Sequence, residues 1–137
     1  MSTTLQLTIK NQMAEVERLN NAFVQFAQQN SLPPRTANAV NLAIEEIVTN
    51  TICYGFEDND EHEIAVSLEL RNGMVETTIT DDAAAFDPIS APKPHLDRGL
   101  DDALPGGLGI HLIRGLMDRL EYRREAGRNV LTLYKSI

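Results

Sequence analysis

Hydrophobic and polar residues alternate along five short stretches of the chain, and this period of two predicts β-strands. Asn72-Gly73 separates two of the stretches and favours a tight hairpin turn, and Ala126-Gly127 lies between two others. The pattern therefore indicates one separate strand followed later by two hairpins. The predicted strands are residues 4–10, 64–70, 75–79, 120–124 and 130–134.

Elsewhere the apolar residues recur every three or four positions, which predicts helices. The first helix is expected to be capped by Asn11 and to end near Asn30. A second helix should begin within residues 31–34 and end near Tyr54-Gly55; it is apolar on almost all sides, so we expect it to be central and largely buried. Residues 108–117 predict a third helix.

The order of elements is strand, helix, helix, two strands, a long loop, helix and two strands. Hairpins dominate this order, so we expect a mixed, mainly antiparallel sheet with helices on one face. This is a two-layer α+β sandwich. No internal repeat or linker is visible, and residues 1–137 are therefore expected to form a single domain.

Composition narrows the classes of function. The chain is 42% hydrophobic, but it has no apolar run long enough for a membrane span and no basic, apolar leader, so we expect neither a membrane anchor nor a secretory signal. With 12 basic and 20 acidic residues, the net charge is −8, and no basic stripe suggests nucleic acid as a partner. The single cysteine, Cys53, excludes an internal disulfide, fits a reducing cytoplasm and is expected to fill core space.

Glu46 and Asn50 are the first candidates for chemistry, because they are polar residues in an apolar helix. At about 100° per residue, Glu46 lies about 40° from Asn50 around the helix, whereas Glu45 lies about 140° away. A carboxylate that accepts a proton beside an amide oxygen that binds a divalent cation suggests phosphoryl transfer. The alternative is that two adjacent glutamates only solvate the edge of the helix.

Asp81 ends a predicted strand and shares its face with Thr77 and Ile79, whereas Asp82 points the other way. A carboxylate in a cleft at this place can accept a hydrogen bond from an exocyclic amine. The alternative is a turn in which the aspartate only closes the strand.

Gly107-Leu108-Gly109 opens the third helix after the long loop. Glycines let backbone N–H groups approach a phosphate, and a helix N-terminus favours negative charge. Glycine also caps ordinary helices, so this segment alone leaves both interpretations open.

Together these segments resemble the anti-sigma regulatory factor serine/threonine kinases of bacteria, a branch of the GHKL ATPases with the Bergerat ATP-binding fold. Residues 43–50 are similar to the family's N box, and residues 81–88, ending in Phe-Asp-Pro, to its adenine-contacting segment. Residues 107–110 are similar to the second glycine box. By this resemblance, residues 89–106 form the lid over ATP, in which Arg98 is a solvated loop residue or a phosphate contact.

The resemblance also implies the roles of individual residues. Glu46 would be the catalytic residue that activates the attacking hydroxyl, and Asn50 would coordinate Mg²⁺. Asp81 would contact adenine, and Thr132 is a candidate for a base contact. The ATP-binding residues that the resemblance implies are Asn50, Asp81, Gly107, Gly109 and Thr132.

The implied activity is transfer of the ATP γ-phosphoryl group to a serine of a STAS-domain anti-anti-sigma protein. Phosphorylation would switch the binding of partners, among them a sigma factor, and a cytoplasmic homodimer is expected. Two alternatives remain. The family's usual glycines after Asp81 are replaced by Ala83-Ala84-Ala85, which suggests a binding module that sequesters partners without catalysis. A free-standing ATPase would need no acceptor at all.

The three histidines lack the spacing of a metal site, so His62, His95 and His111 are expected to be structural or exposed to solvent. Tyr54 stands where many relatives carry histidine, so no histidine-based step is expected there.

Overall fold

The computed structural model describes residues 3–89 and 107–137. The described strands form one sheet in the order β1-β2-β3-β5-β4, and every neighbouring pair is antiparallel. The strands are β1 (Thr4–Lys10), β2 (Glu63–Arg71), β3 (Met74–Asp81), β4 (Arg119–Glu125) and β5 (Arg128–Ser136). The helices are α1 (Ala14–Gln29), α2 (Pro34–Tyr54) and α3 (Gly107–Leu116).

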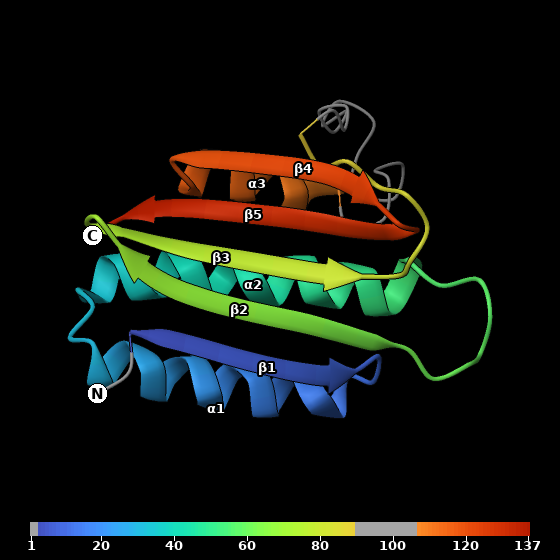
Figure 1. Ribbon diagram of the computed structural model, residues 1–137, viewed down its shortest axis with the longest axis horizontal. Coiled ribbons are helices and arrows are strands. Elements are labelled where there is room, and N and C mark those ends of the chain that lie inside the picture. Colours follow the sequence, from blue (N-terminus) through green and yellow to red (C-terminus); the bar gives the residue numbers. More distant parts are fainter. Residues whose placement is uncertain (1–2, 90–106) are drawn as a thin grey trace.

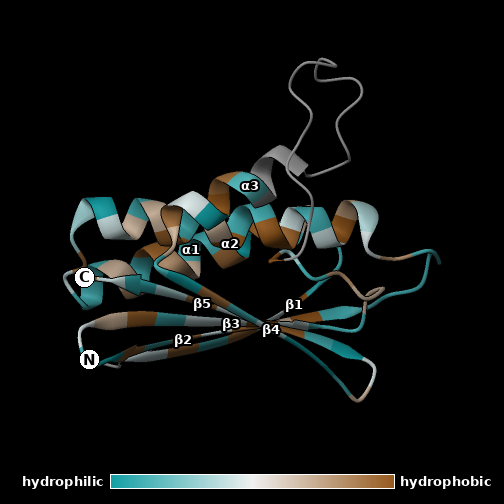
Figure 2. Cartoon of the chain, turned by 90° about the horizontal axis from the view of Figure 1, so that it is seen from above, coloured by the Kyte–Doolittle hydropathy of each residue, from teal (hydrophilic) through white to brown (hydrophobic). Residues whose placement is uncertain are grey.

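The three helices lie on one face of the sheet, and the other face is left open (Figures 1 and 2). The prediction of a two-layer α+β sandwich is confirmed. The sequence pattern predicted a mixed, mainly antiparallel sheet, and the described strands are all antiparallel. The reason is that β3 pairs with β5, and the chain changes direction between these two strands through α3 and β4.

Both predicted hairpin turns are present. Asn72 and Gly73 have φ values of 52° and 75°, and Ala126 and Gly127 have 51° and 77°. Positive φ at both central residues is the backbone of a type I′ turn, whose twist matches that of the flanking strands. The two turns therefore fix the register of the β2–β3 and β4–β5 pairs.

The core lies between the helices and the inner face of the sheet. Ile44 and Val48 of α2 are fully buried there, and so are Ile64 of β2 and Ile79 of β3. The helix α2 was expected to be largely buried; eight of its residues are buried, whereas Leu42 and Tyr54 are 36% and 60% exposed. Since the sheet covers only one side of α2, the helix keeps an open side where polar residues can be presented.

Two smaller predictions are also corrected. Asn11 does not cap α1, whose N-cap is Met13; its side chain instead accepts a hydrogen bond from the His62 backbone N–H and donates one to the Asp60 carbonyl. Cys53 is exposed rather than part of the core. Within the described residues, no helix is both long and apolar enough to cross a membrane.

Candidate functional site

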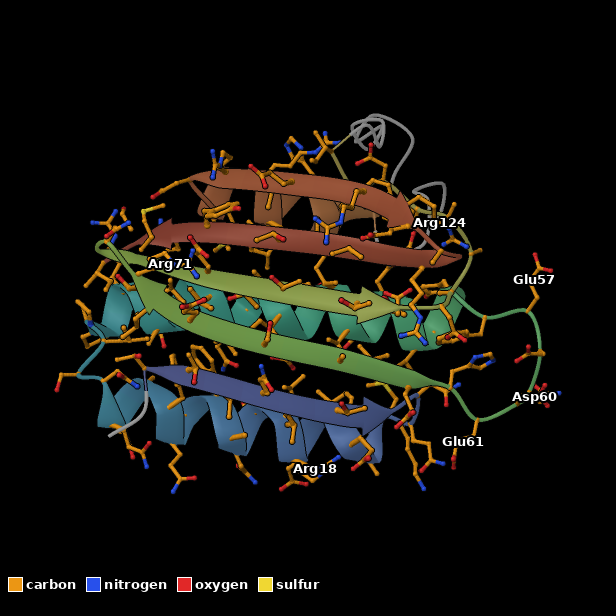
Figure 3. The ribbon with its side chains drawn as sticks, viewed as in Figure 1. Arg18, Glu57, Asp60, Glu61, Arg71 and Arg124 are labelled. Atoms are coloured by element: carbon orange, nitrogen blue, oxygen red, sulfur yellow. The ribbon has the colours of Figure 1, made fainter. Side chains whose placement is uncertain are left out.

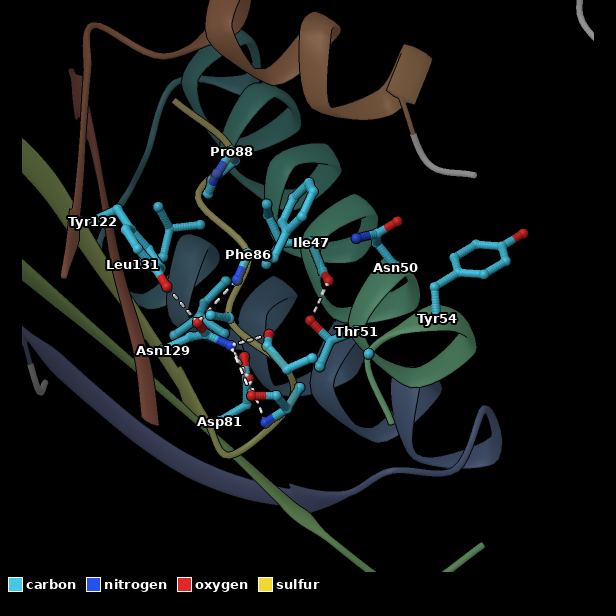
Figure 4. Close-up of a pocket in the computed structure, with 15 residues that line it drawn as sticks. Ile47, Asn50, Thr51, Tyr54, Asp81, Phe86, Pro88, Tyr122, Asn129 and Leu131 are labelled. Carbon is cyan, nitrogen blue, oxygen red and sulfur yellow. Dashed lines mark hydrogen bonds between the residues drawn. The ribbon is translucent and has the colours of Figure 1, made fainter. Parts of the chain in front are cut away.

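A cavity of about 180 Å³ lies between the C-terminal half of α2 and the segment that follows β3 (Figure 4). Its apolar wall is formed by side chains such as Ile47, Ile79 and Leu131. Two exposed aromatic residues, Tyr54 and Phe86, also line it. The polar residues of the lining are Asn50 and Thr51 of α2, Asp81 of β3, Tyr122 of β4 and Asn129 of β5.

Asp81 is the buried carboxylate of the cavity, with only 6% of its surface exposed. Its Oδ1 accepts hydrogen bonds from Asn129 Nδ2 at 2.9 Å and from the Ala83 backbone N–H at 3.0 Å. Its Oδ2 has no hydrogen-bond partner among the residues that the structure describes. Asp81 can therefore close the turn after β3 and also accept a hydrogen bond in the cavity, because Oδ1 serves the turn and Oδ2 remains available to a ligand.

Burial raises the pKa of Asp81, since an apolar surrounding disfavours the charged carboxylate. The hydrogen bonds from Asn129 and Ala83 lower it again. The carboxylate thus depends on its two donors to remain an acceptor.

Asn129 holds the segment after β3 in place. Its Oδ1 accepts hydrogen bonds from Tyr122 Oη at 2.6 Å, Arg124 Nη1 at 3.1 Å and the Phe86 N–H at 3.3 Å. Its Nδ2 also donates to the Ala84 carbonyl at 3.0 Å. The sequence reasoning missed this residue, although a signal was present: Asn129 shares the parity of Leu131 and Leu133, which belong to the apolar face of β5.

Asn50 presents its amide to the same cavity from α2. Its Oδ1 is buried and has no hydrogen-bond partner among the described residues. A buried amide oxygen without a donor suits a hard cation such as Mg²⁺. No cluster of three or more His, Cys, Asp or Glu side chains could hold a metal within the described ranges. A Mg²⁺ ion at Asn50 would therefore share its coordination with phosphates and water, as Mg²⁺ commonly does.

Glu46 lies one turn before Asn50 on α2 and is partly buried, whereas Glu45 is exposed. Glu46 does not line the cavity itself, in contrast to Asn50. Glu46 therefore lies one helical turn from Asn50 but outside the lining of the cavity.

Ala83-Ala84-Ala85 fits the backbone of the cavity without strain. The non-glycine residues with positive φ within residues 3–89 and 107–137 are Ser31, Asn72 and Ala126, so none of the three alanines needs glycine's freedom. Ala83 is buried and contacts Gly55, whose carbonyl accepts a hydrogen bond from the Ala84 N–H at 3.0 Å. The glycine of this contact is Gly55.

Replacing Gly55 by alanine is expected to destabilise the protein by about 1–3 kcal/mol, because a Cβ there would lie 2.7 Å from the Thr51 carbonyl oxygen and 2.9 Å from Ala83 Cβ. Thermal unfolding measures this. Gly115→Ala is the matched control: its Cβ would meet nothing within 4 Å, and alanine should stabilise α3 by about 0.5–1 kcal/mol. Equal stability of wild type and Gly55→Ala would contradict the close packing.

The remaining predicted site residues lie on α3, on β5 or outside the part of the chain that the structure describes. α3 begins at Gly107 and includes Gly109, as expected of a helix opened by these glycines. Thr132 lies on the outer face of β5, where its hydroxyl is 3.4 Å from that of Thr78, and it is not among the residues that line the cavity. Arg98, His95 and most of the predicted lid, residues 90–106, lie outside the described residues.

His62 connects the loop after α2 to the end of β3. Its Nε2 lies 2.7 Å from Asp58 Oδ1, its Nδ1 lies 3.1 Å from Asp82 Oδ1, and its ring stacks on Phe56 at 4.2 Å between centroids. Hydrogen bonds to Asp58 and then Asp82 raise the pKa of His62. Other acidic residues of this loop, Glu57, Asp60 and Glu61, project from the same end of the molecule (Figure 3).

This raised pKa gives a pH-dependent contribution to stability. The protonated ring stabilises the fold fully below the ordinary histidine pKa of about 6.5, and the effect is lost as pH rises through the higher folded-state pKa. His62→Gln should therefore lower the melting temperature more at pH 5.5 than at pH 9. His111→Gln, a substitution at an exposed position on α3, is measured beside it as the comparison variant. A pH-independent effect of His62→Gln would refute a stabilising role for the contacts of the protonated His62 ring with Asp58 and Asp82.

Comparison with known proteins identifies this architecture. The model of the histidine kinase-like ATPase domain matches residues 9–135. The chain belongs to this family. The resemblance inferred from the N box and the glycine segment is thereby confirmed.

Several relatives of this histidine kinase-like ATPase domain are named regulatory kinases or anti-sigma factors. The serine/threonine-protein kinase BtrW of Bordetella bronchiseptica is 41% identical over 69% of this chain and 66% of its own length. The anti-sigma F factor of Clostridium beijerinckii is 28% identical over 72% of this chain and 68% of its own. The matched part thus spans about two thirds of each relative.

A solved structure supports the fold. The crystal structure of the RsbU and RsbW domains of Rv1364c from Mycobacterium tuberculosis superposes with a TM-score of 0.67 over 98% of this chain and 32% of that chain. The sequences are 15% identical, so this likeness concerns the fold.

Proposed function

We propose that this domain is an anti-sigma-type protein serine/threonine kinase that binds ATP with Mg²⁺ and phosphorylates a serine of a STAS-domain anti-anti-sigma protein. The observation that carries the proposal is that Asn50 and Asp81, from separate elements, line one cavity. The names of the relatives, kinase and anti-sigma factor, support the class of activity.

Asp81 would recognise the base. A buried carboxylate with one oxygen free of described partners can accept a hydrogen bond from the exocyclic amine of adenine. Tyr54 and Phe86 offer exposed rings in the lining of the same cavity, and stacking of a base on an aromatic side chain contributes about 1–3 kcal/mol. The alanines that suggested a module without nucleotide are unstrained, which favours the ATP-binding alternative.

The phosphates would extend from the base toward Asn50 and the N-terminus of α3. Asn50 Oδ1 supplies a ligand oxygen for Mg²⁺, and the first N–H groups of α3, from Gly107 to Gly109, supply donors for phosphate. When bound, Mg²⁺ neutralises phosphate charge during transfer. Because the domain carries a net charge of −8, these local donors, rather than a general positive field, would hold the nucleotide.

Glu46 would orient the serine hydroxyl of the partner and accept its proton. Its place one turn from Asn50 but outside the lining of the cavity suits a group that acts on the acceptor rather than on the nucleotide. The lid of residues 89–106 belongs to this proposal by resemblance.

The proposed partners, oligomeric state and location of the protein rest on the same family relationship. Phosphorylation of the STAS-domain partner would release it and leave the kinase to bind a sigma factor, and the kinase would act as a homodimer in the cytoplasm. Neither nucleic acid nor a membrane is a proposed partner.

The test is phosphoryl transfer from γ-labelled ATP to purified STAS-domain proteins of the same genome, in the presence of Mg²⁺. We expect one of them to acquire a phosphoserine and to lose affinity for the kinase. A stable complex without transfer would replace this proposal with the sequestering module. Steady phosphate release that no acceptor alters would favour the free-standing ATPase.

A further inference from the structure

We propose that Asn129 is a positioning residue that holds Asp81 as a hydrogen-bond acceptor and thereby sets a preference for 6-amino over 6-oxo purine nucleotides. The inference rests on the proposed function, because it concerns how the same cavity chooses its base. It assigns a role to a residue that does not itself need to touch the nucleotide.

The orientation of the Asn129 amide is fixed on both sides. Three donors surround its oxygen, from Tyr122, Arg124 and the Phe86 backbone. Its nitrogen faces acceptors only, namely Asp81 Oδ1 and the carbonyl oxygens of residues 83 and 84. A reversed amide would place its oxygen against three acceptors, so the donor toward Asp81 is built into the surroundings.

Asn129 also lies directly opposite Asp81 in the sheet, so its hydrogen bond acts on the carboxylate without an intermediate group. The two residues are partners in the β3–β5 register, and Asn129 is only 7% exposed, so water does not replace its amide easily. Together with the Ala83 N–H, it uses Oδ1 and leaves Oδ2 as the oxygen available to a base. A 6-amino group donates to that oxygen, whereas a 6-oxo group would face it as a second acceptor.

The charged groups around Asp81 already have other partners, so they do not replace Asn129 as the side-chain donor to the Asp81 carboxylate. Besides burial, the negative charge of Asp82 raises the pKa of Asp81, while the positive charge of Arg124 lowers it. Asp82 is itself paired with His62, and Arg124 donates to the Ala83 carbonyl and to Asn129. Those α2 residues that line the cavity are Ile47, Asn50, Thr51 and Tyr54, and they include no carboxylate or basic group.

The variant Asn129→Asp removes the Nδ2 donor but keeps the size and shape of the side chain, so it tests the donor rather than the shape of the site. The new carboxylate keeps an acceptor toward Tyr122, Arg124 and Phe86 but opposes Asp81 with a second negative charge. Two such carboxylates share a proton as pH falls, so a donor toward the base position should appear.

The experiment compares ATP and GTP binding by calorimetry at pH 8 and pH 6 for wild type, Asn129→Asp and Asn129→Ala. Wild type should prefer ATP at both pH values. Both variants should lose ATP affinity by about 10- to 100-fold at pH 8, the loss expected for a hydrogen bond to a charged group. In Asn129→Asp, the ratio of ATP to GTP affinity should fall further at pH 6, a change that a merely structural role would not produce.

Thr80→Val is the control, because Thr80 precedes Asp81 on β3 but faces the outer side of the sheet. Its ATP-to-GTP ratio should equal that of wild type. Melting temperatures identify which variants fold, and carbon-13 NMR of the Asp81 carboxyl in the wild type adds a measurement that needs no variant. We expect an ionised carboxylate with ATP bound at pH 6.5.

An unchanged ATP-to-GTP ratio in a folded Asn129 variant would overturn the inference while leaving the proposed function intact, and so would a protonated Asp81 in the ATP complex. If the wild type binds neither nucleotide, the proposed function fails and this inference fails with it. The two failures are therefore distinguished by the wild-type titration.

Discussion

Replacing Glu46 by glutamine is expected to leave ATP binding unchanged and to reduce phosphoryl transfer by about 10²- to 10⁴-fold. Glutamine keeps the size of the side chain and its place one turn from Asn50, but it cannot take the proton of the acceptor serine. Because Glu46 lies outside the lining of the cavity, the nucleotide should not sense the change. Single-turnover transfer from γ-labelled ATP, with calorimetry on the same sample, measures both quantities.

Glu45→Gln is the matched control for this prediction. Glu45 is adjacent in sequence but exposed and about 140° from Asn50 around the helix, so its loss should change transfer less than about twofold. Transfer at the wild-type rate by Glu46→Gln would dismiss the assigned base. An equal loss in both variants would point to helix charge rather than to a specific proton acceptor.

Asp81→Asn should weaken ATP binding by about 100-fold or more. The amide oxygen can replace Oδ1 as acceptor for Asn129 and Ala83, but the NH₂ group then occupies the position of Oδ2 and opposes the donor of the base. A lost hydrogen bond to a charged group costs about 1.5–3 kcal/mol, and the buried unpaired donors add to this. Calorimetric titration with ATP measures the loss.

Asp82→Asn removes a carboxylate at the next position, on the exposed side of the chain. It should weaken the His62 contact but leave ATP affinity within about twofold, because it does not line the cavity. If Asp81→Asn and Asp82→Asn reduced affinity equally, the effect would be one of net charge, and Asp81 would lose its role in recognising the base.

Local patterns were sufficient to predict most of the fold. The alternation in β2 and β3 and the Asn72-Gly73 turn identify a hairpin, because both depend on neighbours in sequence. The pairing of β3 with β5 was not predicted. It joins strands separated by α3 and β4, and no short-range signal specifies such a contact.

The same limit explains which site residues were found. Asn50 and Asp81 were identified because each is polar at a place where its own helix or strand is apolar. Asn129, which lines the cavity, was missed; Thr132, the residue of β5 that was proposed as a base contact, lies on the face opposite Leu131. Only the β3–β5 register brings Asn129 opposite Asp81.

The three alanines after Asp81 show a further limit. From sequence, a residue in place of a family glycine suggests strain or a blocked site. In the structure, the chain avoids positive φ at Ala83-Ala84-Ala85, and the close contact is accommodated by Gly55 on α2. The room for this contact thus depends on a glycine nearly thirty positions earlier in the chain, which the segment after Asp81 alone does not reveal.

The most direct test of the central claim, that Asn50 and Asp81 form one ATP site, is calorimetry of ATP binding to the wild-type chain with and without Mg²⁺. We expect saturable binding that Mg²⁺ strengthens. Absence of binding at millimolar ATP, equivalent to a free energy weaker than about −4 kcal/mol, would contradict the ATP site and leave a domain that acts only by binding its protein partners.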